Sequence, residues 1–455
     1  MKQSFDLGKD PVAKIFTGYA VPAILGMIVM SIASVVDGFF VGRYVGPEGL
    51  AAVNLTMPLL HVMVALAVMF VVGGATYAGI EMGAGRLKNA SNGFTVTLII
   101  VTFLSLGSMV LGYLFLPGLV RFLGADETVA PHLREYMFYL LPFFVPFLLS
   151  YAFNTFVRRD GWPSFTVVCV ALGSAGNIIL DYIMVGRLDM GMKGAAIATG
   201  CAETLMMILL ASHFFIHESD FKLVSPEFHL KMMGGMIYNG SSELLATVSF
   251  GLVGFLYNRI IMARIGAHGV AAYAVVLYSA SIGVWIMYGL AEAVGPGVSY
   301  NFGAKKKNRI RRFLRLGLGT TFGIGLVWFI ILNLFYEPIA ALFTRDAVNV
   351  HGLASEIVRY YSPAFLIMGI NIIIASYFTA LSMARQSLMV SLSRTLAVIS
   401  VTLIILPMWL GNIGIWLASP VTEFVTLILS LWLLRRCNLD NLDTAAHIAD
   451  SRVTT

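Results

Sequence analysis

The chain has 455 residues, of which 58% are hydrophobic and only 12% are charged, and its formal net charge is +6 at pH 7. Its mean hydropathy is +0.84. Soluble domains carry about a quarter charged residues, so this composition excludes an ordinary soluble protein. Uncharged runs recur as far as Leu434, each near the ~20 residues that a helix needs to cross a bilayer. Transmembrane β-barrels show shorter, strictly alternating segments. The sequence therefore predicts an all-α polytopic membrane protein.

Several function classes are disfavoured at once. The basic run 305–312 joins two apolar segments, which is typical of a cytoplasmic loop rather than of a nucleic-acid site. The three cysteines lie in two apolar runs and a tail, so they indicate no disulfide framework. Motifs of nucleotide-driven pumps and hydrolases are missing, which argues against an enzyme and against a self-contained ATP-driven pump. We expect no cofactor and no metal.

The apolar runs predict twelve transmembrane helices with short turns between them. The expected helices cover 15–42, 50–80, 93–117, 133–157, 164–187, 194–216, 236–263, 270–299, 315–336, 356–382, 387–410 and 414–434. Lys and Arg concentrate in alternate connections, which places both termini in the cytoplasm. The expected domains are a cytoplasmic N-terminus (1–14, retained rather than cleaved), an N-lobe (15–216), a cytoplasmic linker (217–235), a C-lobe (236–434) and a polar, disordered cytoplasmic tail (435–455).

The chain repeats itself with an offset of 220 residues. The run 45–52, VGPEGLAA, matches 265–272, IGAHGVAA, and the run 194–203 matches 414–423, each ending in a glutamate. An even number of helices in each half gives both halves the same orientation. We therefore expect two parallel six-helix repeats around a central cleft that carries the substrate, an arrangement typical of transporters.

Acidic residues within the first half give the strongest functional signal. Asp37 and Asp181 each lie six residues before an arginine that marks the outer end of a span, and Thr199 lies six residues after the lysine at which another span begins. All three are therefore expected roughly 9 Å below the outer surface. Asn177 lies one helical turn from Asp181 on the same face. This set predicts an oxygen-rich pocket for Na⁺, or for a proton shared between paired acids. The alternative is that the two aspartates are separately hydrated near the interface and only structural.

These residues resemble a known family. The motif Asp-Gly-x-Phe-Val-Gly from Asp37, the pair Asn177-x-x-x-Asp181, Thr199, and Asn-Phe-Gly-Ala at 301–304 are similar to the multidrug and toxic compound extrusion (MATE) family, most closely its prokaryotic DinF-like branch. The resemblance covers nearly the whole chain. It implies that Asp37, Asn177, Asp181 and Thr199 form the cation site with Tyr136 nearby. It also implies that Pro22 lets the first helix bend, whereas many prolines in membrane helices only pack.

Other polar residues within the spans have two interpretations each. Glu203 and Glu423 are repeat mates, either protonated and bonded across a helix pair or facing the cleft. Tyr257 takes the repeat position of Asp37, so coupling is expected in the first lobe only. Glu243 and Glu292 either attract a cationic substrate or lie at the interface. Further basic residues, Arg394 and Arg259, are expected to snorkel, and His213 with His217 is expected at the interface rather than on a metal.

The sequence therefore predicts a secondary antiporter of the bacterial inner membrane. It would export lipophilic, mostly cationic small molecules in exchange for H⁺ or Na⁺ by alternating access, as a monomer in contact with membrane lipid. The alternative on the same fold is a flippase or exporter of a lipid-linked or metabolite substrate.

Overall fold

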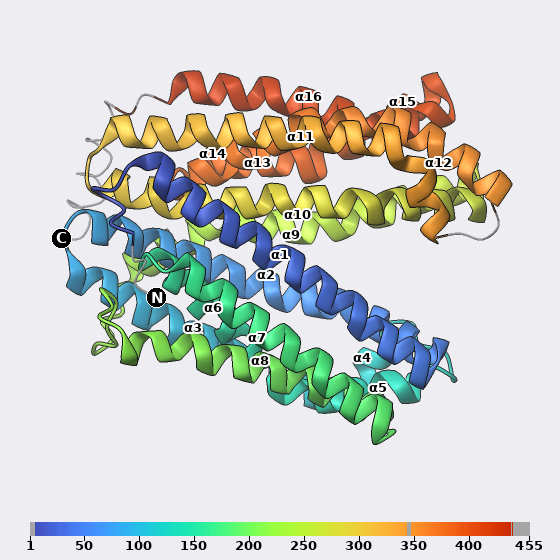
Figure 1. The fold of residues 1–455 in the computed structure, drawn as a ribbon, viewed down its shortest axis with the longest axis horizontal. Coiled ribbons are helices and arrows are strands. Elements are labelled where there is room, and N and C mark those ends of the chain that lie inside the picture. Colours follow the sequence, from blue (N-terminus) through green and yellow to red (C-terminus); the bar gives the residue numbers. More distant parts are fainter. Residues whose placement is uncertain (1–4, 344–346, 438, 440–455) are drawn as a thin grey trace. The chain divides into compact units, whose positions relative to one another are not determined.

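The computed structural model describes residues 5–343, 347–437 and 439, and every regular element within these residues is helical (Figure 1). Twelve of the helical stretches are long and apolar enough to cross a membrane, which confirms the predicted fold class. Residues 1–4 and nearly all of the expected tail lie outside the described residues.

The chain divides into two compact units, one that includes Thr17–Gly240 and one that includes Ser241 and the residues after it. The first unit contains α1 (Val12–Phe40, from Thr17), η1 (Val41–Val45), α2 (Pro47–Gly83), α3 (Leu87–Leu114), α4 (Leu116–Phe122), α5 (Ala130–Leu140), η2 (Leu141–Phe143), α6 (Phe144–Arg159), α7 (Pro163–Asp181), η3 (Tyr182–Arg187), α8 (Gly191–Ile216) and the start of α9. The second contains most of α9 (Leu230–Arg264), α10 (Ala267–Gly303), α11 (Lys307–Phe343), α12 (Ala347–Tyr361), η4 (Ser362–Ala364), α13 (Phe365–Ala380), α14 (Ala384–Leu392), η5 (Ser393–Ala397), α15 (Val398–Leu410) and α16 (Asn412–Arg436).

The sequence repeat is visible in the backbone of both units. Gly46 has φ +106° between the first two spans, and Gly266 has φ +88° at the repeat position. Both angles favour glycine, because a Cβ is strained there. A 3₁₀ turn around Pro142 interrupts the fourth span, and one around Pro363 interrupts the tenth. The two units therefore share backbone turns at matching positions as well as similar sequences.

Several helices are longer than the apolar runs predict. The helix α11 begins at Lys307, within the run expected to be a loop, and α9 begins at Leu230, within the expected linker. Polar residues such as Lys and Arg are good helix formers, so a helix continues beyond the apolar segment that marks it in the sequence. The short helix α4 was not predicted at all.

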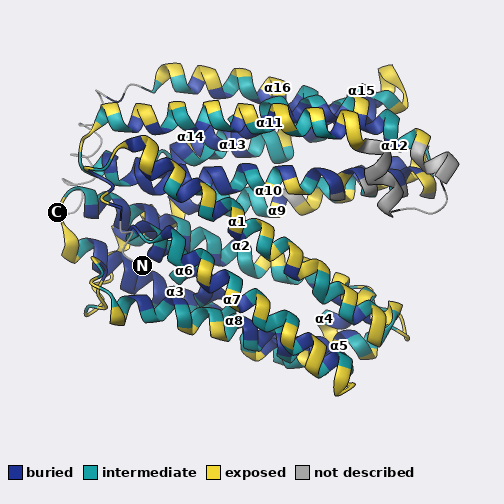
Figure 2. Ribbon diagram, viewed as in Figure 1, coloured by how far each residue is buried: buried dark blue, intermediate teal, exposed yellow. Residues whose placement is uncertain are grey.

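Burial follows the pattern of a membrane protein (Figure 2). Large apolar side chains remain exposed on the spans, among them Phe103 at 71% and Trp409 at 81%. Such exposure would be costly in water but not against lipid. Within the first unit, a buried apolar cluster joins α2, α5 and α8, and this cluster surrounds one side of the candidate site.

Candidate functional site

Asp37 lies in the last turn of α1, four residues before the π-helical segment η1. The helix α1 is continuous from Val12 to Phe40 and includes Pro22 in its interior. Short π-helical segments are rare and occur frequently at functional sites. Asp37 is therefore placed where the regular helix gives way to an irregular turn.

Asp181 is the last residue of α7 and directly precedes a second π-helical segment, η3. Its side chain is fully buried. Neither carboxylate oxygen has a hydrogen-bond partner among the residues that the structure describes. A buried charge without a partner is costly, so this group requires a proton or a cation.

The structure brings four of the five predicted cation-site residues together. The carboxyl groups of Asp37 and Asp181 interact with each other. The Tyr136 hydroxyl on α5 interacts with both carboxyl groups and with Thr199 on α8. Segment η1 packs against both α8 and η3, which holds these chain segments in one place. The two acids are thus not separately placed.

Asn177, the fifth predicted residue, lies one turn before Asp181 on α7. Its Nδ2 atom is buried without a hydrogen-bond partner in the described part of the chain. An amide supplies both a donor and an acceptor. Asn177 therefore adds an unused polar group one turn from the acid pair.

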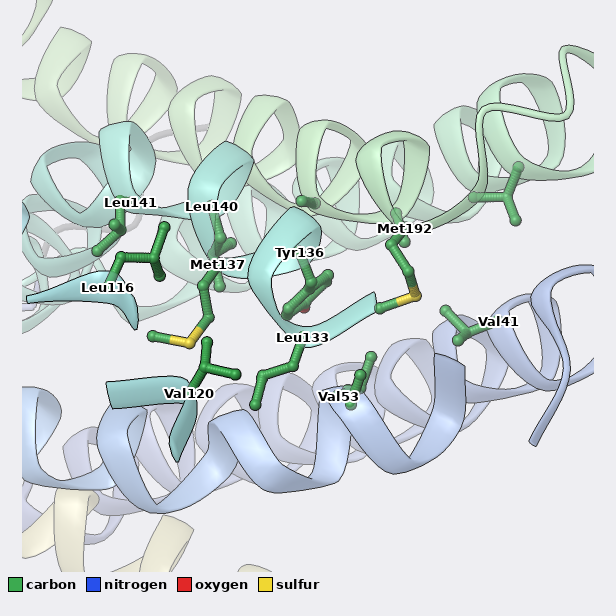
Figure 3. Packing of buried hydrophobic residues seen from close by; sticks show 14 of the residues in the cluster. Val41, Val53, Leu116, Val120, Leu133, Tyr136, Met137, Leu140, Leu141 and Met192 are labelled. Carbon is green, nitrogen blue, oxygen red and sulfur yellow. The ribbon is translucent and has the colours of Figure 1, made fainter. Parts of the chain in front are cut away.

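One side of the acid pair is apolar. Tyr136 is only 4% exposed and lies within the buried cluster that includes Val41, Val53, Leu133 and Met192 (Figure 3). No ion pair joins Asp37 or Asp181 to a basic residue across residues 5–343 and 347–437. Apolar surroundings and a missing base both favour protonation or cation binding by the pair.

Glu203 on α8 is bonded across a helix pair, as one of its two interpretations expected. It accepts a 2.8 Å hydrogen bond from the Ser150 hydroxyl on α6. No basic residue is paired with it in the described residues. Glu203 therefore shares the uncompensated acidic character of the first unit.

The repeat mate of Glu203 has a different environment. Glu423 on α16 accepts a 2.7 Å bond from the Arg394 Nε and a 2.8 Å bond from the Asn371 Nδ2. The expectation that Arg394 snorkels is wrong, because its side chain is only 12% exposed and points to Glu423. The interpretation of Glu423 as a protonated carboxyl does not fit either, because its carboxylate faces the Arg394 guanidinium. A buried acid attracts a buried base when both lie in one bundle.

Tyr257 belongs to an aromatic stack in the second unit. Its ring lies 5.0 Å from that of Tyr273, which lies 6.1 Å from that of Trp416. The Tyr257 hydroxyl is buried without a hydrogen-bond partner among the described residues, although it interacts electrostatically with Glu423. The position that holds an acid in the first unit therefore holds a packed aromatic ring in the second.

The two remaining predicted acids lie near each other in the second unit. Glu243 on α9 interacts with Thr379 and with Glu292 on α10. Both glutamates are partly buried. The structure thus places these two acids side by side. The sequence predicted only that they lie on consecutive helices.

The expectation of interfacial histidines is wrong for His213. This residue is fully buried and its Nε2 lies 2.6 Å from the Asp160 carboxylate. Asp160 also accepts a hydrogen bond from the backbone N–H of Asp220. Within the described residues no three candidate ligands gather for a metal. Sequence reasoning missed this pair and the Arg394–Glu423 pair, although both join residues within or beside apolar runs.

This fold, with an acid pair in a membrane bundle, defines a membrane transporter. A family model described as MatE matches residues 22–183 and 244–404. The chain therefore belongs to the MatE family of multidrug efflux transporters, a family of transporters rather than enzymes, and it is a multi-pass protein of the bacterial plasma membrane. The predicted resemblance is confirmed.

Two of the relatives are described by different cargo. The chain is 26% identical to an FAD transporter of Shewanella oneidensis, over 96% of this chain and 97% of the relative. It is 23% identical to the multidrug export protein MepA of Staphylococcus aureus, over 93% of each chain. Among solved structures, an outward-facing multidrug resistance MATE transporter superposes with a TM-score of 0.90 at 23% identity, covering 98% of this chain and 99% of that one. The match to a solved structure concerns the fold.

Proposed function

We propose that this protein is a secondary active antiporter that exports lipophilic, mostly cationic compounds in exchange for H⁺ or Na⁺. The observation that carries the proposal is the interacting pair of the half-buried Asp37 and the fully buried Asp181, which has no basic partner in the described residues. Such a pair holds a positive ion at a site where water cannot compensate a charge. The similarity to a multidrug export protein supports the class of cargo.

The coupling cycle uses this pair as its switch. With the transporter open outward, Asp37 and Asp181 take up the ion, with Asn177, Thr199 and Tyr136 supplying polar groups beside it. Neutralisation changes the interactions of α1, which bends or shifts at Pro22 and disfavours the substrate. A proton that moves inward across ~100 mV releases about 2.3 kcal/mol.

Pro22 is the proposed hinge because proline removes one helical hydrogen bond and weakens the helix at that point. Two solved structures with this fold are described as MATE in a bent conformation and MATE in a straight conformation. An ion can shift such an equilibrium only by its differential affinity for the two forms. Asp37, on the same helix as Pro22, supplies that difference.

The topology and domains belong to the same proposal. Both termini and the linker 217–235 lie in the cytoplasm, with an N-lobe before the linker and a C-lobe after it. The protein works as a monomer surrounded by lipid. The acids Glu203, Glu243, Glu292 and Glu423, together with Tyr257, contribute to the path of a cationic substrate by alternating access.

Dye transport into everted membrane vesicles tests the proposal. Vesicles that contain the wild-type protein should accumulate ethidium when energised either by an acidic lumen or by a Na⁺-loaded lumen, and the effective gradient identifies the ion. Asp37→Asn should insert normally but transport no dye. Asp126→Asn, at an exposed carboxylate outside the spans, serves as the matched control and should transport as wild type. Full transport by Asp37→Asn would refute the coupling role.

A second function is favoured by one observation. Arg394, whose side chain is 12% exposed, gives the second unit a base that suits an anionic metabolite, and one relative similar over 96% of this chain is an FAD transporter. This matches the alternative of a metabolite exporter on the same fold. The same vesicle assay tests this alternative when FAD replaces ethidium in the outside medium, with the same gradients and variants.

A further inference from the structure

Arg394 lies in the third π-helical segment of the chain, η5, between α14 and α15. None of the five residues of η5 is fully buried. The other two π-helical segments follow Asp37 and Asp181, the acids of the coupling pair. Because π-helical segments are frequent at functional sites, the third one directs attention to Arg394.

The guanidinium of Arg394 is only partly used. Its Nε donates to Glu423 at 2.7 Å, and its Nη1 makes a long 3.4 Å bond to the Tyr288 hydroxyl. Its other N–H groups have no hydrogen-bond partner among the described residues. A guanidinium carries five donors in a fork that matches the two oxygens of a carboxylate or phosphate. The edge that faces away from Glu423 therefore retains the capacity to bind an oxyanion.

The side chain of Arg394 keeps 12% of its surface exposed. A charged group at membrane depth is expected to face the bundle interior or water rather than lipid. Trp285 is linked to Arg394 through Tyr288. It lies three residues before Tyr288 on α10, on the same helical face, and its side chain is 48% exposed. The Trp285 and Tyr288 rings lie 6.3 Å apart.

We propose that Arg394 and Trp285 form a recognition site for planar aromatic compounds that carry a phosphate or carboxylate. The oxyanion pairs with the unused edge of Arg394, and the aromatic ring packs against Trp285. The negative charge of Glu423 lies on the same guanidinium as the oxyanion, so it repels the oxyanion and limits its affinity. This inference rests on the proposed export of organic compounds and names a class of cargo for the second unit.

The repulsion by Glu423 gives the proposal a signature that a merely structural ion pair lacks. Removing Arg394 should weaken binding of an anionic ligand, whereas removing the charge of Glu423 should strengthen it. If the pair only stabilised the fold, both changes would act in the same direction. The sign of the two effects therefore separates a binding site from a structural contact.

Flavins supply matched probes, since riboflavin and flavin mononucleotide (FMN) share one planar ring and differ by a phosphate. Binding to the purified full-length protein is followed by flavin fluorescence. We expect wild type to bind FMN more tightly than riboflavin. Arg394→Gln should weaken FMN binding about tenfold or more and leave riboflavin unchanged, since a charge-assisted pair is lost. Arg394→Lys should fall between, because an ammonium lacks the fork.

Two further variants and one control complete the test. Glu423→Gln should raise the affinity for FMN. If this variant fails to fold, Arg394→Gln combined with Glu423→Gln keeps the Asn371 bond and should bind FMN no better than riboflavin. Arg385→Gln, at an exposed arginine on α14, should bind as wild type. Trp285→Ala should weaken both flavins.

The proposal is overturned if wild type shows no preference for FMN, if Arg394→Gln weakens both flavins equally, or if Glu423→Gln and Arg394→Gln shift FMN affinity in the same direction. Ethidium transport separates failure of the anion site from failure of the proposed antiport. If wild type binds FMN no better than riboflavin but transports ethidium normally, only the anion site is refuted. If wild type shows no gradient-driven ethidium transport, only the antiport is refuted.

Discussion

The two units share one architecture but differ in the partners of the acids that share a repeat position. In the first unit, Asp37 and Asp181 interact with each other and Glu203 is bonded only to a serine. In the second unit, Glu423 at the repeat position of Glu203 is paired with Arg394. At this repeat position, the first unit thus holds an acid without a base, and the second unit holds an ion pair.

The difference shows how a duplicated fold divides labour. A buried acid without a base changes its charge when a proton or cation arrives, so it can drive a conformational change. An acid in a buried ion pair keeps its charge, because losing it would leave the base unpaired. We therefore place ion coupling in the first unit and recognition of cargo in the second.

The largest expected effect follows from weakening the acid pair itself. Asp181→Asn should abolish gradient-driven ethidium transport, because one carboxyl alone cannot share the ion. It should also raise the free energy of unfolding by about 1–3 kcal/mol, since a buried carboxylate without a basic partner is costly. Vesicle transport and thermal unfolding of the same preparation measure both. Transport at the wild-type rate would place coupling elsewhere, and Asp126→Asn controls for loss of an exposed acid.

A large loss of stability is expected from breaking the pair in the second unit. Arg394→Ala leaves Glu423 buried without its base, which should lower the free energy of unfolding by about 3–5 kcal/mol. Adding Glu423→Gln to this variant should recover most of the loss, because no buried charge remains. Thermal unfolding of both variants beside wild type tests the comparison. A single variant as stable as wild type would show that the pair is not buried in the membrane.

Sequence reasoning reached the fold because its signals are periodic and long. The twelve apolar runs and the 220-residue offset required no tertiary information, and depth counting placed Asp37, Asp181 and Thr199 at one level. The extents of helices such as α11 were not predictable from apolarity, because their first turns are polar. The pair of Arg394 and Glu423 was missed for another reason. Segment η5 adds a π-helical turn that changes which face Arg394 presents, and an apolar sequence does not mark such a turn.

A smaller effect is expected at the pair of His213 and Asp160, which has no counterpart in the second unit. The turns at Pro142 and Pro363 are 221 residues apart, so the repeat offset is 221 in this part of the chain and 220 elsewhere. The residues that correspond to His213 and Asp160 are therefore Leu433 and Leu381, both buried. Asp160→Ala should lower the free energy of unfolding by about 1–3 kcal/mol, because the buried imidazole and the Asp220 N–H lose their acceptor. Replacing both residues by leucine should restore part of the stability by copying the second unit. A double variant less stable than either single variant would show that the two units pack differently there.

The smallest expected change in stability concerns the hydrogen-bond partners of Glu203 and Glu423, which share a repeat position. Ser150 gives Glu203 one hydrogen bond, whereas Asn371, at the position matching Ser150, contacts Glu423 twice and accepts a bond from Ser430. Ser150→Ala should therefore lower the free energy of unfolding by only about 0.5–1.5 kcal/mol. Asn371→Ala should lower it further, because more buried groups lose a partner. Thermal unfolding gives both values, and ethidium transport should stay near wild type for Ser150→Ala. If that variant instead lost transport while remaining folded, Glu203 would belong with Asp37 and Asp181 in the coupling machinery, and the uncompensated acids of the first unit would act as one set of three.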